Sequence, residues 1–342
     1  MLHSITDVQH KIVGGCPLLL AGSEAVLAEL PAGNWIGGTI PYFMDANGGT
    51  CSESKIFVTP IPRDATSVQV IEYTARELPN ICRDAPDNGF SVIIMPAEST
   101  VHSVYAQNAP EYEGMYLKPI VGWISGVHLS ALGKQRPKVF NGLTAQASTE
   151  CAVVMHVALP AWRQAEIDIL NVFEPGSGST ITFPAAGFTA TDCNVDGRPA
   201  NFAQYISAAQ PDLHLPLTAD YNGTVVNVSI QSVDPANRLV KFYAPVFPGI
   251  EYRFARPVQD YVAAFDSAMR ARDNIQATFA CNCILNYLYA GLEGKKTGDI
   301  TGPITFGEVA HQLLDQTMVR LWARDSDPIA GSSAATDRTG IA

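Results

Sequence analysis

The chain has 342 residues, of which 47% are hydrophobic and 16% charged, and its formal net charge is -11. This composition supports a large core in one or two domains and excludes a largely disordered protein. The acidic balance, together with the lack of any run of Lys or Arg, argues against nucleic acid and anionic membranes as partners.

The first residues contain no segment typical of secretion or membrane insertion. The apolar stretch at 17–21 is five residues long, whereas a secretory signal needs about 7–15 apolar residues and a membrane-spanning helix about 20. The seven cysteines are scattered, and no Cys-x-x-Cys pair is present to hold zinc. We therefore expect a cytoplasmic protein with reduced thiols and no bound metal.

The first half of the chain is expected to alternate short strands with a few helices. Apolar residues recur with helical spacing over 24–30 and 161–172, and a further helix is expected to begin near Ser99. Apolar and β-branched runs predict strands over 35–40, 55–61, 67–73, 90–95, 120–124, 150–158 and 180–183.

The second half is expected to hold an antiparallel meander flanked by helices. A turn at 196–199 precedes a predicted helix over 200–208. Short turns separate three strands that we expect to pair as a meander, over 224–233, 239–243 and 250–254. We then expect helices over 257–273 and 283–292, and strands over 277–280, 302–306 and 317–323. The small, polar residues after 325 predict a disordered tail.

Two segments far apart in the chain share one pattern. At 36–40 and again at 300–306, a strand leads into a turn of small residues containing Gly and Thr, and a second strand returns at 55–61 and at 317–323. An internal duplication would produce this pattern, and so would a chance match of short Gly-Thr turns. The sequence alone leaves both explanations open.

Four segments resemble a known family of sensory modules. NVDGRPANFAQYI at 194–206 opens a helix after Asp-Gly-x-Pro-Ala, and FPGIEYRF at 247–254 enters a strand through Pro-Gly. GPITFGEVAHQLLDQTMVRL at 302–321 contains a Gly-Glu turn and a final strand, and NWIGGTIPYF at 34–43 holds a Gly-x-Thr turn. In this order they are similar to the segments of the FIST family.

The resemblance implies an α/β (α+β) fold of two sheet-containing halves with mixed or antiparallel strands and flanking helices. It places a FIST N-like domain at 1–190, a FIST C-like domain at 191–324 and the tail at 325–342. The chain departs from the family pattern in two places. Asp315 stands where the family usually has Asn, and the segment before Glu24 is too short for the usual first strand and helix.

FIST proteins are regarded as sensors of small molecules, with amino-acid-like ligands proposed. The resemblance therefore implies a bacterial small-ligand sensor, not an enzyme, that signals through a separate protein such as a histidine kinase or cyclase. Some members bind haem and respond to nitric oxide, so a haem-based gas sensor is the alternative, with His214 as the best-placed axial ligand. A thiol-dependent enzyme using Cys281 or Cys283 is the second alternative, although no known catalytic motif is present.

The turn after residue 301 is the first candidate for a ligand site. Gly302 and Gly307 would let the backbone approach a ligand closely, and free N–H groups in such turns bind carboxylates. Thr305 would add a hydroxyl, and Glu308 would pair with an amino group. Alternatively, the glycines only satisfy the turn, and Glu308 caps a following helix.

Three more residues complete the candidate ligand site. Gly38 and Thr39 form the matching turn of the first half, and we expect them to play the same part. Asn282, between Cys281 and Cys283, is expected to line the pocket. The competing interpretation is that these residues serve only turn geometry and buried packing.

Overall fold

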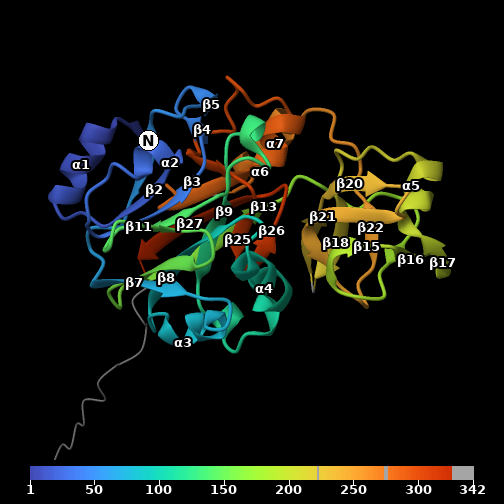
Figure 1. Ribbon diagram of the computed structural model, residues 1–342, viewed down its shortest axis with the longest axis horizontal. Helices are drawn as coiled ribbons and strands as arrows, with labels where there is room; N and C mark the ends of the chain where they lie inside the picture. The colour runs from blue at the N-terminus through green and yellow to red at the C-terminus, as the bar shows by residue number, and fades with distance from the viewer. Residues whose placement is uncertain (222, 273–275, 326–342) are drawn as a thin grey trace, which may run out of the picture.

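The computed structural model describes residues 1–221, 223–272 and 276–325. These residues form a mixed α/β fold in which helices flank five sheets of parallel and antiparallel strands, as the sequence predicts. Figure 1 shows a larger body built from both ends of the chain, in blue, green and red, and a smaller yellow one from its later middle. The tail expected after 325, Asn222 of one turn and the helix end expected at 273 lie outside the described residues.

Three six-stranded sheets build the larger body. The first holds, in spatial order, β1 (Leu2–His3), β6 (Ile56–Pro60), β2 (Leu18–Gly22), β3 (Trp35–Thr39), β10 (Val139–Asn141) and β11 (Gln146–Ser148). The second holds β7 (Ser67–Tyr73), β12 (Ala152–Ala158), β8 (Gly89–Pro96), β9 (Ile120–Ser125), β25 (Glu308–Ala310) and β26 (Gln312–Leu314). The third holds β13 (Arg163–Leu170), β27 (Met318–Asp325), β23 (Phe279–Cys283), β24 (Gly302–Thr305), β4 (Tyr42–Asp45) and β5 (Gly48–Cys51).

All three sheets follow one plan around a central pair of parallel strands, β2–β3, β8–β9 or β23–β24. We name the stretches 2–60, 67–158 and 163–325 units 1, 2 and 3. Within each unit the last strand runs antiparallel beside the parallel pair, and the first strand pairs with the last. The hairpin that completes each sheet comes from a different unit. Thus β10–β11 extends the sheet of unit 1, β25–β26 that of unit 2 and β4–β5 that of unit 3.

This cyclic exchange of hairpins makes the three units one core. The domain boundary expected at residue 190 does not follow the strand pairing, because β13 pairs with β27 and β4 pairs with β24 across it. The two Gly-Thr segments that share a pattern carry β3 and β24, which occupy equivalent positions. A third equivalent strand, β9, shows that the repeat has three copies and not the two suggested by the sequence.

Helices occupy equivalent connections in the three units. Those that precede each parallel pair are α1 (Ile5–Val13), η1 (Leu78–Asn80) with α3 (Ile81–Asp84), and α6 (Tyr261–Arg270). Those that join the two parallel strands, which need a crossover, are α2 (Glu24–Leu27), α4 (Thr100–Asn108) and α7 (Ile284–Tyr289). Unit 2 also contains three short 3-10 helices after α4, namely η2 (Ala109–Glu111), η3 (Met115–Leu117) and η4 (Leu129–Ala131). Across the described ranges, none of the helices combines the length and apolar character needed to cross a membrane.

Between β13 and α6, unit 3 carries an insertion, residues 171–256, which is the smaller body in Figure 1. Its first sheet holds β17 (Arg198–Asn201), β16 (Asp192–Val195), β14 (Ile181–Thr182), β22 (Tyr252–Phe254), β18 (Leu217–Tyr221) and β19 (Thr224–Val228). Its second sheet holds β15 (Gly187–Ala190), β21 (Leu239–Val246) and β20 (Ile230–Asp234), and its helix is α5 (Phe202–Ala209). Phe183 packs edge-on against Phe202 and Phe242, with ring centroids 5.1 and 5.6 Å apart, so the insertion has an aromatic core.

Aromatic side chains also join the sheets of the core. Trp123 of β9 stacks on Phe279 of β23, with ring centroids 5.7 Å apart. Phe43 of β4 stacks on Phe57 of β6 at 6.0 Å. Because each pair spans two sheets, the hydrophobic core lies between the sheets.

The segment before Glu24 does hold a strand and a helix, so the expectation that it is too short for them is wrong. The two-residue β1 and the nine-residue α1 precede β2. Helix α1 begins at a capping box, in which Ser4 Oγ accepts from the Asp7 N–H at 3.2 Å and donates to Asp7 Oδ2 at 2.6 Å. Val8 and Ile12 bury its apolar face.

The helix expected over 161–172 is a strand, β13, and this prediction is wrong. Ile167 and Ile169 alternate with Glu166 and Asp168, a period of two that suits a strand. All eight residues of β13 pair with β27, and this pairing outweighs the local helical spacing. The helix expected over 24–30 is reduced to the four residues of α2.

The meander expected in the second half is also wrong. The strand expected over 224–233 is divided at Ser229 into β19 and β20, which belong to different sheets. β20 pairs with β21, but β22 pairs with β14 and β18. The helix expected from residue 200 begins at Phe202, because residues 198–201 form β17 and Asn201 caps α5 through the Gln204 N–H.

Candidate functional site

The two predicted Gly-Thr turns lie at the ends of equivalent strands. Thr39 ends β3 and Thr305 ends β24, while Ser125, which the sequence reasoning missed, ends β9. Both turns adjoin the end of β9. The Gly126 N–H donates to the Thr39 carbonyl at 2.7 Å, and the Phe306 N–H donates to the Ile124 carbonyl at 3.1 Å.

The predicted site residues are nevertheless buried in the core. Thr39 is 3% exposed, Asn282 is 2% exposed, and Thr305 and Glu308 are fully buried. Thr305 Oγ1 donates to the Gly307 carbonyl at 3.1 Å and lies 3.4 Å from the Asn282 carbonyl oxygen, so three predicted residues do meet. They meet inside the protein and not at an open pocket.

The glycines of these turns serve close strand packing. A Cβ added at Gly302 would lie 2.1 Å from the Ala280 carbonyl oxygen. A Cβ at Gly38 would lie 2.6 Å from Ile94 Cγ2. Atoms of neighbouring strands occupy the space that a side chain at Gly302 or Gly38 would fill. No space for a ligand remains there.

Glu308 occupies a strand position opposite Trp123 in β9, so it does not cap a helix. Its Oε2 accepts from Thr317 Oγ1 at 3.0 Å and from the Thr317 N–H at 3.3 Å. Its Oε1 has no hydrogen-bond partner among the described residues. Burial raises the pKa of Glu308 well above its usual range, which favours the neutral carboxyl. Because the side chain is fully buried, an amino group in solvent does not reach it.

Cys281 and Cys283 are each 1% exposed. Cys281 Sγ donates to the Gly122 carbonyl at 3.4 Å. Burial raises the pKa of both thiols well above the usual range, which disfavours the thiolate that a nucleophile or metal ligand requires. Within the described residues there is no group of three His, Cys, Asp or Glu side chains able to hold a metal ion.

The loop between β26 and β27 connects the core to the insertion. Asp315 Oδ2 accepts from the Ser229 N–H at 2.9 Å, and Asp315 Oδ1 accepts from Ser229 Oγ at 2.8 Å. Gln316 Oε1 lies 2.6 Å from the same hydroxyl, and Gln316 Nε2 donates to the His214 carbonyl at 3.0 Å. Burial raises the pKa of Asp315 to about 7.

The open cavity lies beside this loop, between the insertion and helices α6 and α7. We name it the insertion cleft, and its volume is roughly 400 Å³, within the range of small-molecule sites. Its aromatic walls include Tyr261 and Tyr289, and the ring of His214 lies 4.4 Å from the ring of Tyr289. Its other polar lining residues include Asp212, Asp260, Asn286, Lys295 and Gln316.

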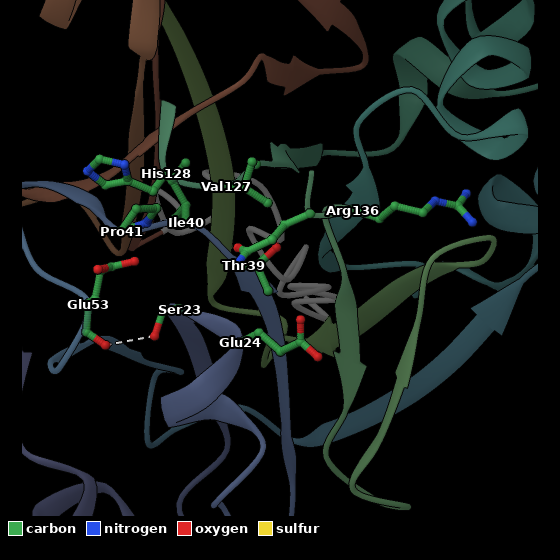
Figure 2. Close-up of a pocket in the computed structure, with 11 residues that line it drawn as sticks. Ser23, Glu24, Thr39, Ile40, Pro41, Glu53, Val127, His128 and Arg136 are labelled. Atoms are coloured by element: carbon green, nitrogen blue, oxygen red, sulfur yellow. Dashed lines mark hydrogen bonds between the residues drawn. The ribbon is translucent and has the colours of Figure 1, made fainter. Parts of the chain in front are cut away.

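A second hollow, shown in Figure 2, lies at the end of β3. Thr39 lines it with Ser23, Glu53 and His128, while the Arg136 side chain points away. Ser23 Oγ donates to the Glu53 carbonyl at 2.7 Å, the dashed line in the figure. The hollow has a volume of roughly 20 Å³, room for about one water molecule. It therefore does not form a ligand site as it stands.

Two residues singled out from the sequence lie in or beside the insertion cleft. Asn282 does not line the cleft but hydrogen-bonds Asn286, which does. His214, the proposed haem ligand, lies in the cleft. The lining comes from the insertion, α6, α7 and the loop before β27, so no local motif could have predicted it.

The comparison with known families gives the affiliation of the chain. A model described as a family of unknown function, DUF6976, matches residues 3–324. The chain belongs to this family. No curated protein matches it. The family description carries no activity and shows no link to the FIST family, so that resemblance remains an interpretation.

Proposed function

We propose that this DUF6976 protein binds a small polar ligand in the insertion cleft and acts as a sensor. The observation that carries the proposal is the cleft itself, which is lined by residues of both the core and the insertion. A ligand held there would contact both bodies at once. Binding would therefore favour one position of the insertion relative to the core.

The Ser229 contacts supply a route for this coupling. Asp315 and Gln316 hold Ser229 of the insertion, and Gln316 also lines the cleft. A ligand that touches Gln316 would change the same hydrogen bonds that join insertion and core. In this proposal the protein works in the cytoplasm, and the altered insertion is recognised by a separate signalling protein, such as a histidine kinase or cyclase.

The ligand proposal is tested by filling the cleft. Val258 lines it and is half-buried in a segment without regular structure. Val258→Trp should block binding, because the indole occupies ligand space. Val13→Trp is the matched control, since Val13 is 80% exposed on α1. A thermal-shift screen of small amines, acids and neutral compounds should give stabilising compounds for the wild type and for Val13→Trp.

Two results would count against the proposal. Either no compound in a broad screen stabilises the wild type, or the compounds that do stabilise Val258→Trp equally well. The haem alternative is tested separately, because haem bound through His214 gives a Soret absorption band. If that band is absent after haem reconstitution, the gas-sensor alternative is wrong.

A further inference from the structure

Asn286, one of the residues that line the insertion cleft, carries a buried hydrogen-bond acceptor without a partner among the described residues. Asn286 is 1% exposed and lines the cleft. Its Nδ2 donates to Asn282 Oδ1 at 3.0 Å and to the Thr317 carbonyl at 3.4 Å. Its Oδ1 has no hydrogen-bond partner among the described residues. Because an unpaired buried acceptor is destabilising, a ligand that supplies a donor gains affinity here.

The orientation of the Asn286 amide is set by its neighbours. Turning the amide over would place Oδ1 against two oxygen atoms, those of Asn282 and Thr317. Asn282 cannot adapt freely, since its own Oδ1 also accepts from the Cys283 N–H at 2.8 Å. The atom left for a ligand is therefore the oxygen of Asn286 and not its nitrogen.

The charged groups that line the cleft are mostly carboxylates. Both ends of the Gln316 amide are already hydrogen-bonded, since Oε1 accepts from Ser229 Oγ and Nε2 donates to the His214 carbonyl. Asp212 and Asp260 contribute two carboxylates, against the single ammonium of Lys295. The cleft thus carries more negative than positive charge, in a protein whose formal net charge is already -11.

The walls of the cleft suit a positive charge as well. Phe173, Tyr261 and Tyr289 line it, and the faces of such rings attract cations. Burial raises the pKa of Tyr289 to about 12, and Asp315 and Asp212 are among the groups that add to this effect. The Tyr289 hydroxyl therefore remains neutral at physiological pH and can itself accept a hydrogen bond.

We propose that the insertion cleft takes a small organic cation whose primary ammonium group donates to Asn286 Oδ1 while Asp212 and Asp260 balance its charge. This inference rests on the proposed function, because it names the ligand class of the same cleft.

The ligand class is tested with matched probes on the full chain. Phenethylamine and putrescine present a primary ammonium, phenylpropionate and succinate present carboxylates, and the N-trimethyl form of phenethylamine keeps the charge without an N–H donor. Calorimetric titration should show the amines binding at least about tenfold more tightly than the acids. The trimethyl probe should lose about tenfold, because it cannot donate to Asn286.

Two variants change the charge of the cleft in opposite directions and should therefore change amine binding in opposite directions. Asp260 Oδ1 caps α6 through the Ala263 N–H at 3.0 Å, and Asn caps a helix as well as Asp. Asp260→Asn should therefore keep the fold and weaken amine binding roughly threefold. Lys295 is exposed, and Lys295→Ala should strengthen amine binding roughly threefold by removing a like charge.

The outcomes separate this inference from the proposed function. If the acids bind more tightly and Lys295→Ala weakens their binding, the cleft is a ligand site but the amine class is wrong. If the trimethyl probe binds as tightly as phenethylamine, the role of Asn286 is wrong. If neither set of probes binds, the amine class is overturned, while the wider screen with Val258→Trp decides on the cleft itself.

Discussion

Polar residues are buried at the strand ends of the core but line an open cavity beside the insertion. In the core, three equivalent strands end in Thr39, Ser125 and Thr305, and all three side chains are buried. Beside the insertion, Asp212 and His214, from the loop before β18, and Asp260, at the start of α6, line with helix α7 a cavity of roughly 400 Å³. In the core, the same strand pairing repeats in all three units, and the equivalent strand ends are buried. The cleft forms where one unit departs from the shared plan.

The largest effect on stability should come from replacing a core glycine by alanine, and a glycine of the insertion serves for comparison. Gly302→Ala would bring a Cβ to 2.1 Å from the Ala280 carbonyl oxygen of the neighbouring strand. We expect a loss of about 3 kcal/mol in the free energy of unfolding. Gly178→Ala in the insertion meets no atom within 4 Å and should change it by less than about 0.5 kcal/mol. Denaturant titration measures both, and equal losses would contradict the contrast.

The next effect concerns pH and the buried Asp315. Its pKa in the folded protein, about 7, lies above the usual value of 3.8. The folded state therefore holds this proton more tightly, and the contribution of Asp315 to stability falls as pH rises from about 4 to 7 and then levels off. The full shift corresponds to about 4 kcal/mol. Asp315→Asn should recover about 2 kcal/mol at pH 8, because the amide is neutral but still polar, and little at pH 4.

Asp192→Asn is the control for this prediction, because Asp192 is exposed on the insertion. Its unfolding curves at pH 4 and pH 8 should follow those of the wild type. If Asp315→Asn keeps the pH dependence of the wild type between pH 4 and 8, Asp315 is not the group responsible.

The smallest effect on stability should come from removing a contact between the insertion and the core. Ser229→Ala removes the hydroxyl that Asp315 and Gln316 share and leaves acceptors unpaired, at a cost of about 1.5 kcal/mol. Hydrogen exchange should rise in the insertion more than in the core. Ser207→Ala is the matched control, since Ser207 Oγ donates to the Ala203 carbonyl within α5. Equal exchange in the two variants would show that Ser229 does not hold the insertion.

Strands with strong apolar or β-branched runs were predictable, and their partners were not. The strands expected over 67–73 and 120–124 were found within one residue of β7 and β9. In contrast, β13 was read as a helix because its helical spacing and its strand alternation are both present, and only pairing with β27 decides between them. Long-range pairing of this kind leaves no local signal.

The candidate site shows the same limit. The sequence predicts that Gly302 and Gly38 let a ligand approach closely, whereas a neighbouring strand or side chain lies against them in the structure. Asp315 was noted for replacing the Asn usual in the FIST pattern, yet its contact with Ser229 depends on the position of the insertion. Asn286 lines the cleft only because α7 and the insertion meet there.

The cyclic exchange of hairpins has a consequence for synthesis of the chain. The β4–β5 hairpin is made long before its partner β24, since Met44 pairs with Gly302. At about 5–20 residues per second, the nascent chain carries unpaired strand edges for many seconds. Such edges promote aggregation. We therefore expect folding to be completed only after the last unit has left the ribosome, with chaperones shielding the earlier units until then.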